Sequence, residues 1–141
     1  MKTIRDVMRA SFLFRLVPAA SVSEAVRVMT DNNVGIVAVV EGDALVGVLS
    51  ERDVVQRVLG RGLDPRTTPV EEVMTTEVVL GDENEDCRLA MLKMDRANIR
   101  HLPIMRDGRV VSMLSVRDLM RAELADAGVE LEFLKQYLFQ G

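Results

Sequence analysis

The stretch Val48-Leu49-Ser50-Glu51-Arg52-Asp53-Val54 returns 65 positions later as Met113-Leu114-Ser115-Val116-Arg117-Asp118-Leu119. Each copy runs from an apolar, β-branched segment through Ser-x-Arg-Asp into a new apolar run. This change predicts a strand that ends where a helix begins. Because the same junction occurs twice in one small chain, the sequence indicates a duplicated unit.

The sequence around the two junctions repeats as well. A short extended arm over 12–17, a helix from Ser21 to about Asn32 and a hairpin are expected before the first junction. In the second copy the arm is expected over 78–80. At the constant offset of 65, identical residues fall at Ala25/Ala90, Met29/Met94, Asn33/Asn98, Val46/Val111, Leu49/Leu114, Ser50/Ser115, Arg52/Arg117, Asp53/Asp118 and Leu59/Leu124.

The repeat predicts an α+β fold of two βαββα-type half-domains packed about a pseudo-two-fold axis, because neither half can cover its own sheet. The segment from Gly60 to Pro69 contains two Gly and two Pro and is expected to be the linker. The predicted division is 1–60 for the first motif, 61–69 for the linker, 70–124 for the second motif and 125–141 for a C-terminal amphipathic helix. That last helix would dock either on its own module or across a subunit interface.

Composition excludes several classes of function. The formal net charge of −4 argues against nucleic-acid binding as the main task, because such binding depends on clustered Lys and Arg. The single cysteine, Cys87, cannot form an intrachain disulfide and is expected in the core. Since the sequence has neither an apolar run of membrane-spanning length nor a signal-peptide core, we expect a cytoplasmic protein without membrane association.

The ordered motifs resemble a tandem pair of cystathionine-β-synthase-type (CBS) domains, also called a Bateman module. Gly35-Ile36-Val37-Ala38-Val39-Val40 and Leu45 to Asp53 fit the first copy of the family pattern, while Arg100-His101-Leu102-Pro103-Ile104 and Leu114 to Leu119 fit the second. The resemblance covers residues 1 to 124 and is greatest to the stand-alone pairs. It implies a regulatory module that binds AMP, ADP, ATP, NAD(H) or S-adenosylmethionine in two clefts between the paired sheets, with AMP or ATP favoured.

Within that resemblance the junction residues acquire separate expected roles. An ionised carboxylate can accept hydrogen bonds from both ribose hydroxyls, so Asp53 and Asp118 are the predicted ribose contacts. Free backbone N–H groups at a helix start favour phosphate oxygens. The predicted phosphate contacts are therefore Ser50, Arg52, Ser115, Arg117 and Arg100.

Adenine needs an apolar slot with a few backbone hydrogen bonds. The residues expected to line it are Leu16, Ile36 and Ala38 in the first cleft and Val79, Leu80, His101 and Pro103 in the second. No cofactor is required beyond this regulatory ligand. The resemblance also implies a disc-like homodimer of two pairs and an unidentified protein partner.

Each of these residues also has a structural interpretation. Ser-x-x-Asp at a helix start is close to a capping box, in which the two residues only cap the helix. His101 has no partner constellation that would make it a catalytic base, and neither catalytic residues nor metal ligands are assigned. The acidic stretch 81–86 could repel a phosphate tail, bind a cation or form a solvated cap for the next helix. A ligand-free interaction scaffold is the alternative function, and an enzyme ranks third.

Overall fold

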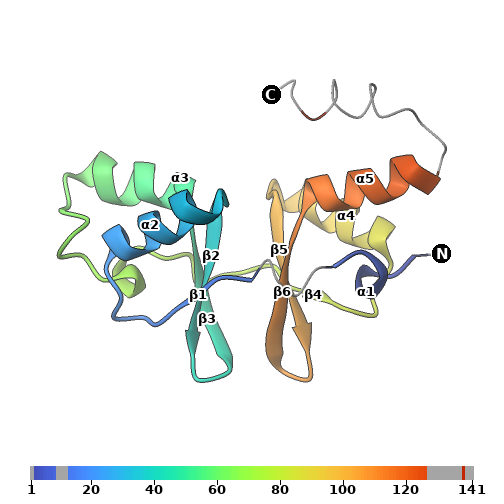
Figure 1. Ribbon diagram of the computed structural model, residues 1–141, viewed down its shortest axis with the longest axis horizontal. Coiled ribbons are helices and arrows are strands. Elements are labelled where there is room, and N and C mark those ends of the chain that lie inside the picture. Colours follow the sequence, from blue (N-terminus) through green and yellow to red (C-terminus); the bar gives the residue numbers. More distant parts are fainter. Residues whose placement is uncertain (1, 9–12, 127–137, 139–141) are drawn as a thin grey trace.

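The computed structural model describes residues 2–8, 13–126 and 138, and Figure 1 shows two similar halves side by side. Each half has a three-stranded sheet, in the orders β1-β2-β3 and β4-β5-β6, with helices at one end of it. The expected α+β architecture of two βαββα-type halves is confirmed. The helix expected over 125–141 falls almost entirely outside the described residues.

The first half follows the predicted order closely. Its elements are β1 (Arg15–Leu16), α2 (Val22–Asn32), β2 (Ile36–Glu41), β3 (Ala44–Ser50), α3 (Glu51–Asp53), the π-helical turn η2 (Val54–Val58) and the 3-10 turn η3 (Leu59–Arg61). The Ser21 hydroxyl caps α2 by accepting from the Glu24 N–H at 3.1 Å. The helix ends at Asn33, whose φ of 52° takes the left-handed conformation that Asn tolerates well. The helix expected to begin at Ser50 is α-helical only over Glu51–Asp53, and the chain then continues as a π-helical turn and a 3-10 turn.

The second half repeats this order as η4 (Val70–Glu72), β4 (Gly81–Asp82), α4 (Cys87–Ala97), β5 (His101–Arg106), β6 (Arg109–Ser115) and α5 (Val116–Asp126). The expected arm over 78–80 lies one step too early, because the residues that pair with β5 are Gly81 and Asp82. A side chain on Gly81 would come within 2.7 Å of the Leu102 side chain, so glycine permits this close pairing. Cys87 is buried in the core, as predicted.

The two halves exchange their N-terminal turns. The first turn, α1 (Ile4–Val7), lies beside α5 in the second half, as Figure 1 shows, and buries Ile4 completely in the core of that half. Val70 of η4 is completely buried in the first core, and its N–H donates to the Ala20 carbonyl at 2.8 Å. Each core is therefore completed by a segment that precedes the other motif in sequence.

A third apolar cluster lies between the two sheets. Its buried members are Ala38, Val40, Val48, Val110 and Met113. The Arg15 guanidinium also crosses from the first half and donates to the Val110 carbonyl at 3.2 Å. The halves thus share an apolar seam that fixes the position of the two junctions.

Within the described residues, no helix has the length and apolarity needed to cross a membrane.

Candidate functional site

Both Ser-x-Arg-Asp junctions form the same hydrogen-bonded cap. Ser50 N and Ser50 Oγ each donate to Asp53 Oδ2 at 3.0 Å, and Asp53 N donates back to Ser50 Oγ at 3.2 Å. At the second junction the corresponding distances between Ser115 and Asp118 are 3.1, 2.9 and 3.2 Å. The capping geometry foreseen as the structural interpretation is therefore present at both helix starts.

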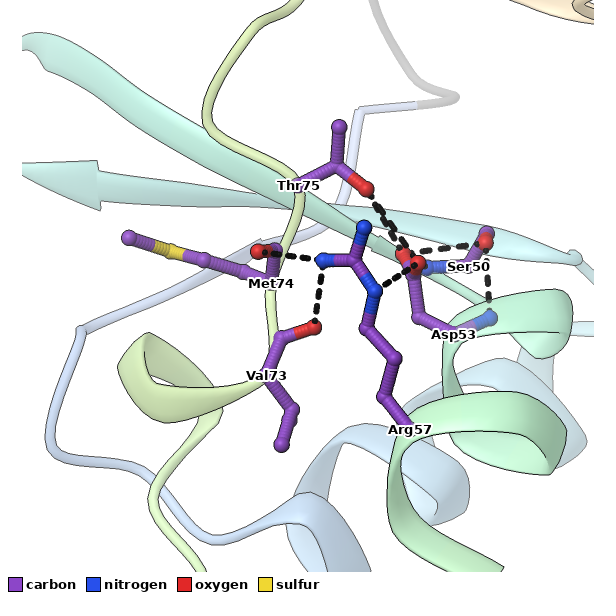
Figure 2. A network of polar contacts seen from close by, with 6 residues as sticks. All are labelled: Ser50, Asp53, Arg57, Val73, Met74 and Thr75. Atoms are coloured by element: carbon purple, nitrogen blue, oxygen red, sulfur yellow. Dashed lines mark hydrogen bonds and ion pairs between the residues drawn. The ribbon is translucent and has the colours of Figure 1, made fainter. Parts of the chain in front are cut away.

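The first junction has two further partners, which Figure 2 shows around Asp53. Thr75 Oγ1 lies 3.2 Å from Asp53 Oδ1 and 3.3 Å from Oδ2. Arg57 Nε lies 3.7 Å from Oδ1, and Arg57 Nη1 donates to the carbonyls of Met74 at 3.0 Å and Val73 at 3.3 Å. Asp53 keeps only 8% of its surface exposed. Its carboxylate is buried and held from both sides.

Sequence reasoning did not single out Thr75 or Arg57. The spacing of Arg57 four residues after Asp53 was the available signal, since residues i and i+4 are neighbours on a helix. Thr75 had no local signal, because it reaches Asp53 from the segment after the linker. Only the packing of that segment on the first half brings its hydroxyl to the junction.

The segment carrying Thr75 lies against β3 because Gly47 leaves room for it. Val48 N donates to the Thr75 carbonyl at 3.0 Å, and Thr75 N donates to the Val48 carbonyl at 2.8 Å. A Cβ on Gly47 would lie 2.6 Å from Met74 Sδ and 2.9 Å from the Thr75 carbonyl oxygen. Glycine is required here for close backbone approach.

The second junction is simpler. Among the described residues, Ser115 alone donates hydrogen bonds to Asp118, which is half-buried. At the repeat offset of 65, the position of Arg57 is taken by Ala122, which has neither charge nor donor. Among the residues that the structure describes, the two aspartates thus share a cap, and Asp53 alone has further partners in Thr75 and Arg57.

A cavity of about 1460 Å³ lies between the halves and borders the first junction. It is lined on one side by Ser50, Arg52, Asp53 and Ile36, and on the other by Val79, Arg100, His101 and Pro103, all of which were candidate site residues. Three of the four residues expected around the second cleft's adenine, Val79, His101 and Pro103, thus line the same cavity as the first junction. The cavity joins polar groups at a helix start to an apolar wall from the other half.

The remaining candidates lie elsewhere. Leu16 is buried in the first core and Ala38 in the seam between the sheets. Leu80 is 41% exposed, and its carbonyl accepts from Lys93 Nζ at 2.8 Å. The residues of the second junction, Ser115, Arg117 and Asp118, are not among the described residues that line this cavity. The structure therefore brings only part of the predicted set together.

Charges of both signs surround the cavity. The acidic lining residues are Glu51, Asp53, Glu77, Asp95 and Glu123, and the basic ones are Arg52, Arg57, Arg88 and Arg100. Burial lowers the pKa of His101, opposed by the charges of Asp118 and Glu51 and assisted by those of Arg100 and Arg117. The imidazole is therefore neutral at pH 7. No group of three or more His, Cys, Asp or Glu in the described residues could hold a metal ion.

The acidic stretch 81–86 does not act as a uniformly solvated cap. Asp86 does cap α4, accepting from Arg88 N at 2.9 Å. Glu83 is only 3% exposed, and lies 2.7 Å from Arg5 Nη2 and 2.6 Å from Arg106 Nη2. Hydrogen bonds from Arg106 and then Arg5 lower the pKa of Glu83 to about 2. The Glu83 carboxylate thus links the N-terminal turn to the second half, because it forms ion pairs both with Arg5 of that turn and with Arg106 of β5.

Comparison with known proteins gives a consistent set of relatives. The CBS domain family model matches residues 4–60 and 70–125. The CBS domain-containing protein YhcV of Bacillus subtilis is 35% identical over 119 residues, covering 84% of each chain. The mitochondrial CBS domain-containing protein CBSX3 of Arabidopsis thaliana is 33% identical over 127 residues, which are 86% of this chain and 61% of that protein.

Solved structures of similar proteins agree with the fold. The CBS domain protein NE2398 superposes with a TM-score of 0.81 at 30% identity, covering 87% of this chain and 98% of that one. The CBS domain protein PAE2072 from Pyrobaculum aerophilum, which was solved as a complex with AMP, superposes with a TM-score of 0.79 at 26% identity. That match covers 90% of this chain and 98% of that one.

Proposed function

This chain belongs to the CBS domain family, and we propose that it is a regulatory module that binds an adenosine-containing ligand in the cavity between its halves. The observation that carries the proposal is the convergence on one cavity of a buried carboxylate at a helix start, an apolar wall and several arginines. The AMP complex of the related protein PAE2072 supports the choice of ligand class. Stand-alone CBS-domain proteins are generally regulatory rather than catalytic.

The lining residues supply the three kinds of contact that an adenosine nucleotide requires. Asp53 would accept hydrogen bonds from the ribose hydroxyls, since a carboxylate offers two oxygens to a vicinal diol. Ile36, Val79 and Pro103 would form the apolar slot for adenine, with the neutral His101 imidazole at its side. Purine faces are held well by aliphatic side chains in such slots.

The phosphate would lie near the start of α3. The Ser50 junction provides the positive end of a helix, although the N–H groups of Ser50, Glu51 and Asp53 are already bonded within the chain. Arg52 and Arg100 provide charge from the two halves. The cavity exceeds the roughly 300–1,000 Å³ typical of small-molecule pockets, so a nucleotide and its tail fit within it. The mixed charge of the lining makes AMP the first ligand to test, before the more highly charged ATP.

The regulatory role requires partners. We propose that two chains associate as a homodimer, that the module works in the cytoplasm, and that ligand occupancy is passed to a protein partner. Light scattering with and without AMP measures the self-association. A monomer under both conditions would contradict the homodimer.

Isothermal titration calorimetry with AMP, ATP, NADH and S-adenosylmethionine tests the binding proposal. We expect at least one of the four to bind, and Asp53→Asn to weaken that binding by about tenfold or more, because a hydrogen bond to a charged group is lost. Asp31→Ala, which removes an exposed carboxylate on α2, is the matched control and should bind like the wild type. Absence of binding by all four ligands at millimolar concentration would overturn the proposal.

A ligand-free interaction scaffold is the second candidate, and the capping boxes at both junctions favour it. In that case Asp53 and Asp118 act only on stability, and no nucleotide shifts the melting temperature. A ligand-dependent rise in melting temperature, lost in the Asp53→Asn variant, would exclude this candidate.

A further inference from the structure

The acceptor capacity of Asp53 is almost fully used by the chain itself. A carboxylate has about four lone-pair positions for hydrogen bonds. Ser50 N and Ser50 Oγ both donate to Oδ2, which leaves that oxygen saturated. The Thr75 hydroxyl, with its single proton, lies 3.2 Å from Oδ1 and 3.3 Å from Oδ2, and Arg57 Nε lies 3.7 Å from Oδ1. About one position therefore remains for an incoming donor.

A ribose diol needs two acceptor positions, because each of its hydroxyls donates one hydrogen bond. Ser50 cannot yield its share without breaking the helix cap, and this cap also satisfies the backbone N–H groups of both Ser50 and Asp53. Arg57 is held in place by the carbonyls of Val73 and Met74. The Thr75 hydroxyl is the donor that can leave by rotation about a single bond.

From this geometry we infer that the Thr75 hydroxyl competes with the ligand's vicinal diol for Asp53 and thereby sets the affinity of the first junction. The inference rests on the proposed function and adds a residue that determines its affinity. Figure 2 shows the Thr75 hydroxyl directed at the Asp53 carboxylate from the segment opposite the helix. When the diol binds, this side chain turns away from Asp53.

The backbone around Thr75 does not need to move for this exchange. Its N–H and carbonyl are both bonded to Val48, at 2.8 and 3.0 Å, and those bonds do not involve the side chain. The two arginine-to-carbonyl bonds from Arg57 hold the preceding residues in the same way. The displacement is confined to one side chain, and the cost to the ligand is the bond between Thr75 and Asp53.

Within the described residues, competition of this kind occurs at the first junction only. Thr75 contacts Asp53, whereas Asp118 receives its hydrogen bonds from Ser115 alone among the described residues. Arg57, whose Nε lies 3.7 Å from Asp53 Oδ1, is replaced by Ala122 at the equivalent position of the second repeat. Removing the Thr75 hydroxyl should therefore leave the second junction unchanged.

Calorimetric titration of AMP and of 2′-deoxy-AMP into the wild type and the Thr75→Val variant tests the inference. Valine keeps the shape of threonine but cannot donate a hydrogen bond. We expect Thr75→Val to bind AMP about tenfold more tightly, because the ligand no longer has to break a bond to a charged group. For 2′-deoxy-AMP, which lacks one hydroxyl of the diol, the same variant should gain little.

Three variants act as controls. Thr75→Ser keeps the hydroxyl and should bind AMP like the wild type, and Thr75→Ala, which also lacks the hydroxyl, should reproduce the gain if the valine variant folds poorly. Thr76→Val changes the neighbouring exposed residue and should have no effect. An unchanged or weaker affinity of Thr75→Val for AMP would overturn the competition while leaving the proposed function in place. An equal gain for both nucleotides also overturns it, and a chain that binds no adenosyl ligand in any variant overturns the proposed function and this inference together.

Discussion

Replacing each junction aspartate by alanine in the ligand-free protein should cost very different amounts of stability. Asp53→Ala and Asp118→Ala each remove a capping box of the same geometry. Loss of a helix cap costs about 0.5–2 kcal/mol, so this part should be equal in the two variants. The pair is matched within one chain, since the two residues occupy equivalent positions of the repeat.

The first junction carries an additional loss. Asp53→Ala also leaves the Thr75 hydroxyl without its acceptor and removes the carboxylate that faces Arg57. A hydrogen bond to a charged group contributes about 1.5–3 kcal/mol, which brings the expected cost of Asp53→Ala to about 2–5 kcal/mol. For Asp118→Ala we expect only about 0.5–2 kcal/mol, the cost of the cap.

Urea unfolding followed by far-ultraviolet circular dichroism measures both losses, with the slope against urea checked for constancy. Combining Asp53→Ala with Thr75→Val should cost less than the sum of the single changes, because the two residues interact. Equal losses at the two junctions, or strict additivity of Asp53→Ala and Thr75→Val, would refute the network drawn in Figure 2.

The remaining predictions concern packing and pH. Ile4→Ala should destabilise the protein by about 2–5 kcal/mol in urea unfolding, because Ile4 is completely buried in the second core; a loss below about 1 kcal/mol would contradict the exchange of N-terminal turns. Gly47→Ala should lower the melting temperature in calorimetry by an amount equivalent to about 1–3 kcal/mol, because its Cβ would overlap Met74 Sδ and the Thr75 carbonyl, whereas no change would show that the segment 74–75 does not lie against β3. The pKa of Glu83 is lowered from its ordinary 4.5 to about 2, so its stabilising contribution is complete above about pH 4.5 and is lost as the pH falls toward 2. Acid unfolding of Glu83→Gln should lack this part of the pH dependence, and an unchanged dependence would contradict the pairing with Arg5 and Arg106.

Much of the fold could be predicted because the same sequence pattern occurs twice in the chain. Local signals placed the elements within a few residues. These signals are the strand-to-helix changes at Ser50 and Ser115 and the helix ends at Ser21 and Asn33. The path of the N-terminal turn could not be predicted in this way. Both turns carry a similar apolar pattern, so the sequence alone does not say which core each turn enters. The structure places Ile4 in the second core and Val70 in the first.

The site was predictable in its parts but not in its combination. The sequence named Asp53, and the repeat suggested a separate cleft for each copy. The cavity lies between the halves, where the family resemblance places the clefts, and Val79, His101 and Pro103, which were assigned to the second cleft, line it together with the first junction. The contact of Thr75 with Asp53 and the ion pairs of Glu83 were not predicted, for the same physical reason. Each acts on residues distant in sequence, so neither has a spacing that local analysis can use.

The most direct measurement of the central claim is a crystal structure of the chain grown with saturating AMP. We expect adenosine in the cavity, with both ribose hydroxyls on Asp53, the adenine between Ile36 and Val79, and the Thr75 hydroxyl turned away from the carboxylate. An empty cavity at saturating AMP would contradict it, as would a nucleotide bound at a site that does not include Asp53.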